Sequence, residues 1–405
     1  MRPLAVSAMS FLVVMGLVSL FSDMTYEGAR SVYGAYLPLL GASGAAVGFV
    51  SGLGEFAGYG LRLITGILAD RYRSYWLMTI LGYGMNLVAI PLLALVPENG
   101  WMWACGLIIL ERTGKAIRQP AKNTLISFAA AQVGQGKSFA LQECMDQVGA
   151  CLGPCMLFGV LWFKDGDDPL RAYALCFALL LLPALLAVGC LLLARRRFPH
   201  PERFEPPSDK APATPPTTAF LFYLAGISLL AVGFADFPLL TMHAARLGLT
   251  PDSALPLLYA GAMLVDAIAA LFFGFLYDRK GFQALFWAGL LSAPFAFFAF
   301  CIPSLWSVLT GVVLWGIGMG AQESIFKAAV ADLSPRASRS TSYGFFESVF
   351  GLFWFLGSWG MGALYDLHPA YLAALSVSAQ ALALPFFLLL ARRTAASRRP
   401  VPHAE

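Results

Sequence analysis

The sequence predicts an all-α integral membrane protein whose twelve transmembrane helices form two pseudo-symmetric six-helix bundles. Its composition is the first reason: of 405 residues, 59% are hydrophobic and 12% are charged, whereas soluble domains carry about 25% charged residues. The second reason is a succession of apolar segments long enough to cross a bilayer, and the third is a pair of motifs that repeats in the two halves. The composition argues against a water-soluble enzyme and excludes a disordered chain, which needs low hydrophobicity.

Twelve apolar segments follow one another along the chain. The first begins near Ser7 and continues past Asp23 to about Leu37, so we interpret it as a retained span and not as a signal peptide, whose apolar core is short. The later spans are expected at about residues 44–69, 75–96, 101–122, 138–163, 170–194, 218–243, 253–276, 282–302, 305–329, 341–364 and 370–391. They must be helices, because backbone groups in hydrocarbon have no water to bond.

The longest polar stretch separates two groups of six spans. Residues 195–217 open with three arginines and continue rich in proline, so we interpret them as a linker and not as a domain. The sequence thus predicts an amino-terminal six-helix bundle (1–194), a cytoplasmic linker (195–217), a carboxyl-terminal six-helix bundle (218–391) and a cytoplasmic tail (392–405).

Basic residues are distributed unevenly between the two sides. With both termini in the cytoplasm, the outer loops keep little more than Lys164, Arg171 and Arg246. The inner side receives Arg71, Arg73, Lys137, Arg195, Arg196, Arg197, Arg279, Lys280, Arg336, Arg339, Arg392, Arg393, Arg398 and Arg399. Cytoplasmic loops are enriched in lysine and arginine, so we expect a multi-pass protein of the inner (cytoplasmic) membrane with cytoplasmic termini.

Two short motifs recur in the second half. The segment 66–71 (GILADR) is matched by 274–279 (GFLYDR) at an offset of 208 residues, and 138–143 (SFALQE) by 342–347 (SYGFFE) at an offset of 204 residues. Two matches at nearly one offset indicate duplicated halves, which are expected of many secondary transporters.

These features together resemble the major facilitator superfamily, and the resemblance extends from the first span to the last. It depends on the twelve spans, the central linker, and the motif at 66–71 with its weaker copy at 274–281. In that family the motif is typically G-x-L-a-D-r-x-G-r-r. We take Ser74 to stand at the second glycine position, whereas the copy keeps its glycine as Gly281, and the closing basic pair is missing. The resemblance implies the major facilitator fold and transport by alternating access, and it does not specify the substrate.

The residues of the motif indicate a conformational role. Gly66 would let a neighbouring helix approach closely, and Arg71 lies at a helix C-terminus, where cations are favoured. Asp70 can accept hydrogen bonds from a helix N-terminus across the pseudo-symmetry axis; by resemblance, this contact would latch the outward-open state against the eleventh span. The alternative is that Asp70 and Arg71 form only an interfacial ion pair. The copy supplies Gly274, Asp278 and Arg279 for the same role.

The fifth span contains Gly149, Gly153 and Pro154, followed by Gly159. Small residues four apart allow tight helix packing, and proline bends a helix because it removes a backbone hydrogen bond. The pattern resembles the G-x-x-x-G-P-x-x-x-G signature of proton-coupled drug exporters in the superfamily. Glycine pairs with this spacing are also common for packing alone.

Ionisable side chains are frequent within the spans, where each costs about several kcal/mol unless a partner or an aqueous cavity supports it. Asp23, Glu27 and Arg30 share one face of the first span because of their spacing. The expected residues for proton coupling and substrate binding are Asp23, Glu27, Arg30, Glu55, Arg62, Glu111, Arg112, Asp236, Asp266 and Glu323. By resemblance, the first, fourth, seventh and tenth spans line the central cavity. The alternative is a static ion-pair network that positions the helices.

Asp23 and Glu27 are the expected proton carriers, because a carboxyl group in a low-dielectric cavity favours its neutral form. Arg30 or Arg112 would then compete with the proton. Glu143 and Glu347 occupy equivalent positions of the repeat, and we expect a gating or structural role for both and for Asp146. Six aromatic residues crowd the eleventh span, where ordinary packing is expected and an apolar substrate pocket is the alternative: Phe345, Phe346, Phe350, Phe353, Trp354 and Phe355.

The leading hypothesis is a secondary transporter that exports a small organic molecule in exchange for protons. The alternative is that the same transporter is a proton symporter that imports a small organic anion held by Arg30 and Arg112. A membrane sensor, an enzyme or a channel has less support, because the sequence contains no nucleotide-binding glycine loop. The expected partners are the substrate, protons and the lipid bilayer; we expect a monomer, no nucleic-acid binding, no cofactor and no metal.

Overall fold

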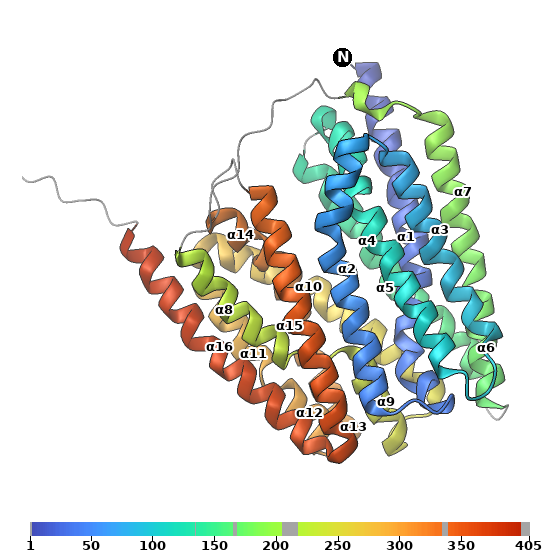
Figure 1. The fold of residues 1–405 in the computed structure, drawn as a ribbon, viewed down its shortest axis with the longest axis vertical. Helices are drawn as coiled ribbons and strands as arrows, with labels where there is room; N and C mark the ends of the chain where they lie inside the picture. The colour runs from blue at the N-terminus through green and yellow to red at the C-terminus, as the bar shows by residue number, and fades with distance from the viewer. Residues whose placement is uncertain (1, 134, 165–167, 205–217, 334–338, 398–405) are drawn as a thin grey trace, which may run out of the picture.

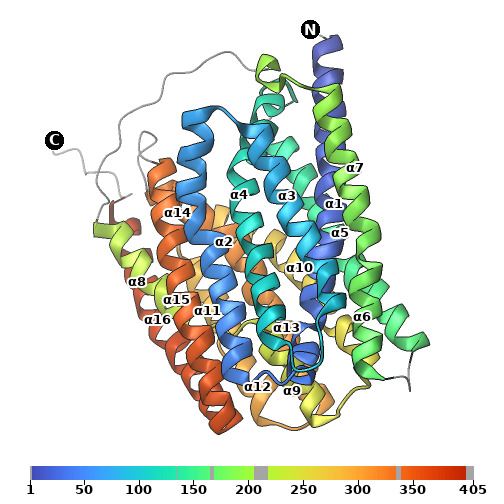
Figure 2. The same ribbon diagram turned by 45° about the vertical axis from the view of Figure 1, so that its right-hand side comes forward.

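The chain folds into a bundle of long helices (Figure 1). The computed structural model describes residues 2–133, 135–164, 168–204, 218–333 and 339–397, and the regular elements within these ranges are all helices. In Figure 1 helices α1 to α7 lie on the right and α8, α11, α14, α15 and α16 on the left, with α9 below and between them; in the turned view of Figure 2, α10 and α13 overlap the helices α1 to α7. We call α1 to α7 the amino half and α8 to α16 the carboxyl half.

The amino half consists of helices that follow the predicted spans closely. Span six is divided into two helices, α6 and α7, at Leu180, with Pro183 in the first turn of α7. The elements are α1 (Arg2–Leu39), α2 (Gly44–Tyr72), α3 (Tyr75–Leu92), η1 (Leu93–Leu95), α4 (Trp101–Val133), α5 (Gln135–Phe163), α6 (Pro169–Leu179), α7 (Leu181–Arg197) and the short η2 (Pro201–Phe204).

The carboxyl half is more interrupted. Span seven breaks before Asp236, whose side chain accepts a hydrogen bond from the amide of Phe237 and so caps α9, and span nine breaks at Pro294. The elements are α8 (Thr218–Gly233), α9 (Phe237–Leu247), η3 (Asp252–Ala254), α10 (Leu255–Lys280), α11 (Gln283–Ser292), α12 (Phe295–Cys301), α13 (Leu305–Ala321), the π-helix η4 (Gln322–Phe326), α14 (Lys327–Leu333), α15 (Arg339–Leu367) and α16 (Pro369–Ser397).

The helices account for the twelve predicted spans. Within the described residues, nine helical segments are long and apolar enough to cross a membrane. The other three predicted spans are α2, α4 and α15; α4, for example, carries Glu111, Arg112 and Lys115 within one turn. The predicted fold class is confirmed. The exact boundaries of the two bundles stay a prediction, and residues 205–217 of the linker and 398–405 of the tail lie outside the described residues.

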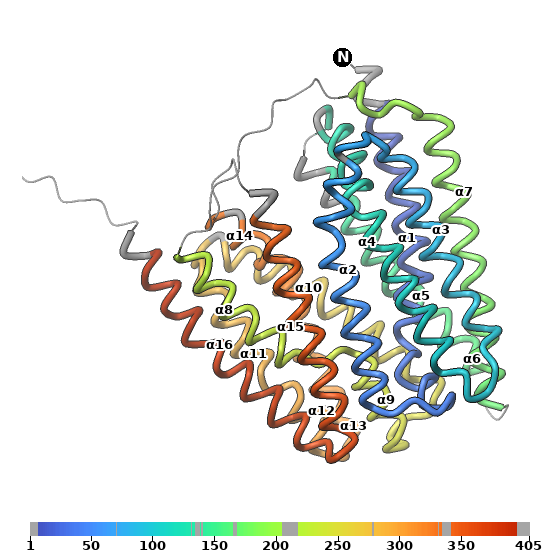
Figure 3. The backbone as a smooth tube through the Cα atoms, in the orientation of Figure 1, coloured from blue at the N-terminus to red at the C-terminus, as the bar shows by residue number. Residues whose placement is uncertain are grey.

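One end of the molecule is held together by glycines. Near the end opposite the termini, which we call the far end, α2 and α15 pack backbone against backbone, and Figure 3 shows the two helices side by side along the boundary between the halves. A Cβ atom added to Gly48 would lie 2.3 Å from the carbonyl oxygen of Ser358, and one added to Gly362 would lie 2.4 Å from that of Gly44. We call this packing, with Gly52 against Phe355, the glycine contact.

Glycines also join α1 and α5 within the amino half. A Cβ atom on Gly149 or on Gly153 would lie 2.3 Å from the carbonyl oxygen of Leu20 or of Met24, respectively. The expectation for Gly66 is wrong: a Cβ atom there would meet Pro120 at 3.5 Å, an ordinary contact. Gly274 has open space around it, so the glycines of the two motif copies do not bring helices together here.

The sequence alignment of the motif also needs a correction. At the offset of 208 residues, the partner of Gly281 is Arg73 and not Ser74. Both residues end their helices with a positive φ, 48° at Arg73 and 55° at Gly281, but their ψ angles differ: 32° at Arg73 and −136° at Gly281. Arg73 is therefore in the left-handed helical conformation, which is strained for an arginine.

We predict that Gly48→Ala lowers the melting temperature of the purified protein, because the new methyl group meets backbone that cannot rotate away. Overpacking of this kind costs about 1–3 kcal/mol. Gly58→Ala on the same helix is the control, since no atom lies within 4 Å of its added Cβ, and it should be neutral or slightly stabilising. Equal melting temperatures for the two variants would contradict the glycine contact.

We also predict that Arg73→Gly raises the melting temperature, because glycine adopts the left-handed conformation without the steric cost. The net gain should be about 1 kcal/mol, the difference between relieved strain and added chain entropy. Arg71→Gly, two residues earlier and within α2, should lower stability by about 1 kcal/mol. A loss of stability in both variants would show that Arg73 is not strained.

Candidate functional site

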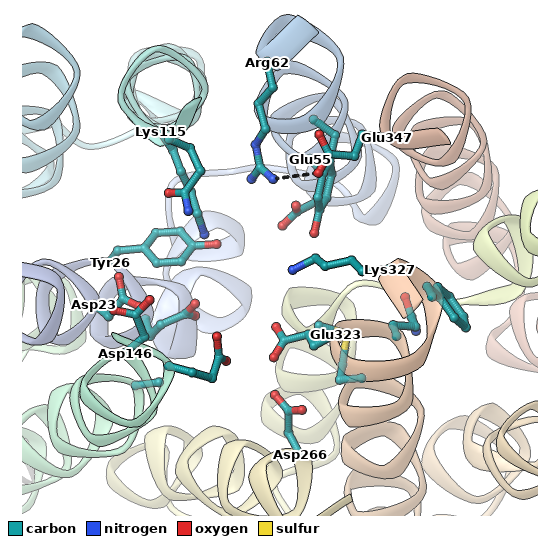
Figure 4. Close-up of a pocket in the computed structure, with 18 of the residues that line it drawn as sticks. Asp23, Tyr26, Glu55, Arg62, Lys115, Asp146, Asp266, Glu323, Lys327 and Glu347 are labelled. Carbon is teal, nitrogen blue, oxygen red and sulfur yellow. Dashed lines mark ion pairs between the residues drawn. The ribbon is translucent and has the colours of Figure 1, made fainter. Parts of the chain in front are cut away.

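A charged cavity lies between the two halves, on the side of the glycine contact that faces the termini. It has a volume of about 180 Å³, and helices of both halves line it. Its charged side chains comprise eight carboxylates and six cations: Asp23, Glu27, Glu55, Glu143, Asp146, Asp266, Glu323 and Glu347, with Arg30, Arg62, Lys115, Arg118, Lys122 and Lys327. Figure 4 shows side chains from α1, α2, α4, α5, α10 and the η4–α14 region pointing into one space.

Helical spacing explains how α1 and α2 supply the amino half of the wall. Asp23, Glu27 and Arg30 all line the cavity, as residues on one helical face should. Glu55 and Arg62 are also seven residues apart, so both line the cavity as well. The sequence spacing is thus sufficient to direct these five side chains to the same space.

Arg30 lies at the centre of an ion-pair network that joins the halves. Its Nη2 atom is 2.6 Å from Oδ1 of Asp236, the N-cap of α9, and 3.3 Å from Oε1 of Glu55, and its Nη1 atom is 4.0 Å from Oε2 of Glu27. Tyr259 of α10 donates a hydrogen bond to Glu27. Arg30 is 4% exposed, so these partners replace the water that its guanidinium would otherwise need.

Three residues expected at the cavity lie behind its wall instead. Arg112 pairs with Glu55 at 3.0 Å and with Glu111 at 3.3 Å, and Glu111 accepts a hydrogen bond from Asn86 of α3. Asp236 is 1% exposed and caps α9. Glu111, Arg112 and Asp236 are therefore not lining residues, because Glu111 faces the α3–α4 interface and the other two are covered by their partners.

The cations of α4 are held by partners of the amino half. The ammonium of Lys115 lies 4.0 Å from the ring centre of Tyr26, and the guanidinium of Arg118 lies 4.3 Å from that of Tyr83. Lys122 is 3.8 Å from Asp146 and donates a hydrogen bond to Ser19. Cation–aromatic contacts stabilise such charges without neutralising them.

Glu143 and Glu347 have different surroundings despite their equivalent positions in the repeat. Glu347 pairs with Arg62 at 3.6 Å, across the boundary between the halves, as the dashed line in Figure 4 marks. Glu143 accepts a hydrogen bond from Gln147 at 3.4 Å. Both carboxylates line the cavity, together with Asp146, so the gating role expected for them would act at the cavity itself.

The predicted latch of Asp70 stays a prediction, because the side chains of Asp70 and Asp278 lie outside the described part of the structure. The arginines that follow them are exposed at the end that carries the termini, where Arg71 lies over the ring of Tyr72 and Arg279 over that of Phe275.

At the far end of α2 and α15, an aspartate does bind a helix N-terminus of the other half, as predicted for Asp70 at the opposite end. Asp366, in the last turn of α15, accepts hydrogen bonds from the amides of Gly44 at 2.8 Å and Ala45 at 2.7 Å. These are the first amides of α2, where the helix dipole favours a negative charge. Asp366 therefore fastens the glycine contact and helps to close the far end.

Sequence reasoning missed the uncharged polar residues of the cavity. Gln147 donates hydrogen bonds to both Glu143 and Glu323, and Gln322 lines the wall next to Glu323. Glutamine inside a span gives no distinctive signal. The aromatic residues of α15 also divide by face: the cavity is lined by Phe346, Phe350 and Trp354, whereas Phe345 is exposed.

The chain has relatives along most of its length. Residues 4–357, and in an overlapping match residues 237–405, fit the sequence model of the Major Facilitator Superfamily. Uncharacterized proteins of Mycobacterium tuberculosis and Mycobacterium bovis are 40% identical over 391 residues, which cover 95% of this chain and 93% of theirs. Multidrug resistance protein MdtH of Photorhabdus laumondii is 29% identical over 119 residues, 29% of each chain.

Solved structures with similar folds are transporters. A peptide transporter POT in complex with sulfate matches with a TM-score of 0.73 and 15% identity, covering 95% of this chain and 94% of that chain. The nucleoside transporter NupG matches with a TM-score of 0.69 and 12% identity, covering 96% and 99%. A bacterial homolog of the human lysosomal transporter Spinster, inward-facing and unoccupied, matches with a TM-score of 0.68 and 16% identity, covering 98% of this chain and 99% of that chain. At these identities the likeness shows the fold.

We predict that Asp366→Asn shifts the molecule away from the conformation described here. Loss of the charge at the α2 N-terminus should cost about 1 kcal/mol, or about a fivefold change in population. Spin labels at positions 71 and 279, in a variant without native cysteines, would report a shorter distance as the far end opens and the termini end closes. Asp168→Asn is the control, because Asp168 caps α6 within one half; an equal response of both variants would contradict the role of Asp366.

Proposed function

Because the chain belongs to the Major Facilitator Superfamily, we propose that it exports a small organic molecule in exchange for protons. Membership makes it a multi-pass membrane transporter that works by alternating access, and not an enzyme. The observation that carries the more specific proposal is the cavity: fourteen charged side chains gather in one space between the halves, and the glycine contact closes its far end.

The energetics of buried charge support a cavity that handles ions. Each charge at the depth of the hydrocarbon core costs about several kcal/mol unless it is solvated or paired. A purely structural network would leave each charge paired, as Arg30 is with Asp236. Here Glu323 and Lys327 are exposed within the wall, so water reaches the cavity from the open end. Accessible carboxylates in such a place can exchange protons with one side of the membrane.

The placement of basic residues supports an orientation with the termini in the cytoplasm. Exposed arginines and lysines lie at that end on α2, α7, α10 and α16: Arg71, Arg73, Arg195, Arg196, Arg197, Arg279, Lys280, Arg392 and Arg393. By the preference of cytoplasmic loops for these residues, the cavity would open to the cytoplasm and the protein would reside in the inner membrane as a monomer.

Asp23 and Glu27 are the proposed proton carriers. Glu27 contacts both halves, through Arg30 on its own helix and through the hydroxyl of Tyr259. A proton on Glu27 would weaken its attraction to Arg30 and so change the balance of contacts between α1 and α10. Asp23 lies one turn away, lines the cavity and interacts electrostatically with Lys115 and Arg118, which supports its assignment as a second proton carrier.

Alternating access would exchange one set of end contacts for the other. In the present state Asp366 of α15 binds the N-terminus of α2 at the far end. In the opposite state, Asp70 of α2 would bind the N-terminal end of α15. The same two helices would then act as the closing pair at both ends, with their roles reversed.

Import of an organic anion held by Arg30 and Arg112 has less support. Both guanidinium groups are neutralised by carboxylates at 3.3 Å or less, and Arg112 lies behind the cavity wall. Export agrees with the partial similarity to a protein named for multidrug resistance, and with the glycines and proline of α5, of which Gly149 and Gly153 pack against α1.

We predict that Asp23→Asn and Glu27→Gln each abolish uphill transport and leave exchange across the membrane intact, because the substrate path remains and only the proton is lost. Inverted membrane vesicles would be offered a panel of fluorescent organic cations and radiolabelled organic anions, with the lumen acidified. Uptake into the acid lumen supports export. Asp168→Asn, in an exposed loop, is the control. Uphill transport that survives both cavity substitutions would show that the proton carriers are elsewhere.

A further inference from the structure

Three carboxylates of the cavity form a cluster at the boundary of the halves. We call Glu143 of α5, Asp266 of α10 and Glu323 of η4 the acidic cluster; all three line the cavity, and Figure 4 shows Asp266 and Glu323 next to each other on one wall. Gln147 bridges the cluster, with hydrogen bonds of 3.4 Å to Glu143 and to Glu323.

Backbone packing explains why Asp266 and Glu323 come together. A Cβ atom on Gly320 would lie 2.3 Å from the carbonyl oxygen of Asp266, so α13 and α10 are in direct backbone contact at this level. The π-helix that begins at Gln322 widens the next turn and directs Gln322, Glu323 and Phe326 towards the cavity. Such π-turns are frequent at functional sites.

The negative charge of the acidic cluster is not balanced by its surroundings. In the described residues no cation lies within ion-pair distance of the cluster; the other cavity cations are engaged with partners of their own, as described above. The ionisable groups that face the cluster are Glu27 of α1, Lys115 of α4 and Lys327 of α14. Lys115 also lies over Tyr26, so two ammonium groups face the three carboxylates of the cluster and the additional carboxylate of Glu27.

Buried polar atoms without partners point to a missing ligand at the same wall. Oδ1 of Asp266, Nε2 of Gln322 and Nε1 of Trp354 have no hydrogen-bond partner. These residues are only 1%, 8% and 3% exposed, and each lines the cavity. Burying such groups without partners is unfavourable. Oδ1 of Asp266 is an acceptor that suits a positive group, whereas the N–H groups of Gln322 and Trp354 would donate to an acceptor atom of a bound molecule.

The apolar surroundings of the cluster indicate the type of that molecule. Among the described residues, no group of carboxylates is arranged to hold a metal ion. Aromatic and thioether side chains continue the wall beside it: Met263, Met319, Phe326, Phe346, Phe350 and Trp354. Aromatic faces attract organic cations.

We propose that the acidic cluster binds the positive group of an organic cation whose apolar body packs against this aromatic wall. The proposal rests on the proposed transport function and names the substrate class that the cavity would carry. It also separates two tasks in space, because Asp23 and Glu27 of the amino half would handle the proton and the acidic cluster would handle the cargo.

Two probes of equal size and opposite charge test the proposal. Binding of tetraphenylphosphonium and of tetraphenylborate to the purified full-length protein in detergent is measured by titration calorimetry, with empty micelles as the blank. We expect the cation to bind and the borate not to bind. Asp266→Asn and Glu323→Gln should each weaken binding of the cation by about tenfold. Stronger binding of the borate, or unchanged affinity in both variants, would overturn the proposal.

Two further variants test whether misfolding, and not loss of a cation contact, weakens binding in Asp266→Asn and Glu323→Gln. Asp168→Asn removes one carboxylate from an exposed loop outside the cavity, the same change of charge as Asp266→Asn, so affinity for the cation should stay within about threefold. Lys327→Gln removes one of the two ammonium groups that face the cluster and should strengthen binding of the cation by about threefold. A damaged protein would not gain affinity, and weaker binding in this variant counts against the proposal.

This binding experiment needs neither a proton gradient nor a conformational change. If the cation binds as expected but Asp23→Asn and Glu27→Gln leave uphill transport intact, the proton mechanism is wrong and the cation site stands. If those two variants behave as predicted and the phosphonium does not bind, only the assigned substrate class is wrong.

Discussion

The pairing of Arg30 with Asp236, Glu55 and Glu27 is the interaction on which the rest of the structure depends. A guanidinium that is almost completely buried at this depth is stable only if carboxylates replace its water. Those carboxylates come from α1, α2 and α9, so the requirement fixes α1 and α2 beside a helix of the other half. The charges that remain unpaired then have to face an aqueous space, and the cavity between the halves provides it.

The closure of the far end has a different physical basis. The glycine contact brings the backbones of α2 and α15 together, and Asp366 adds a charge at the start of α2. Beside the glycines, the ring of Phe49 in α2 packs edge-on against the rings of Phe355 and Trp359 in α15, so these rings must part when the far end opens. An interface of this kind can be exchanged for another at the opposite end, which is how packed helices move between discrete arrangements.

The cavity is asymmetric in charge, and this asymmetry links the proton and the substrate. On the amino side, carboxylates and cations are largely matched, with Lys122 against Asp146 as one example. On the carboxyl side, Asp266 and Glu323, together with Glu143 and Glu27, outnumber the two ammonium groups of Lys115 and Lys327 that face them. A transporter that exchanges protons for organic cations needs carboxylates that can be neutralised by a proton or by the cation. The amino side of this cavity would supply the carboxylates for the proton, and the carboxyl side those for the cation.

The sequence by itself determined the membrane-spanning helices, the repeat of the halves and the face shared by Asp23, Glu27 and Arg30, because hydropathy and helical spacing act within one segment. Gly44, Gly48 and Gly52 have helical spacing in the sequence. The sequence does not show that α15 is the helix they pack against. Only the tertiary structure decided that Glu111 faces away from the cavity and that Asp266 meets Glu323 and Glu143. The reason is physical: whether a charge is paired, hidden or exposed depends on which helices meet and how each is rotated, and those contacts join residues far apart in the chain.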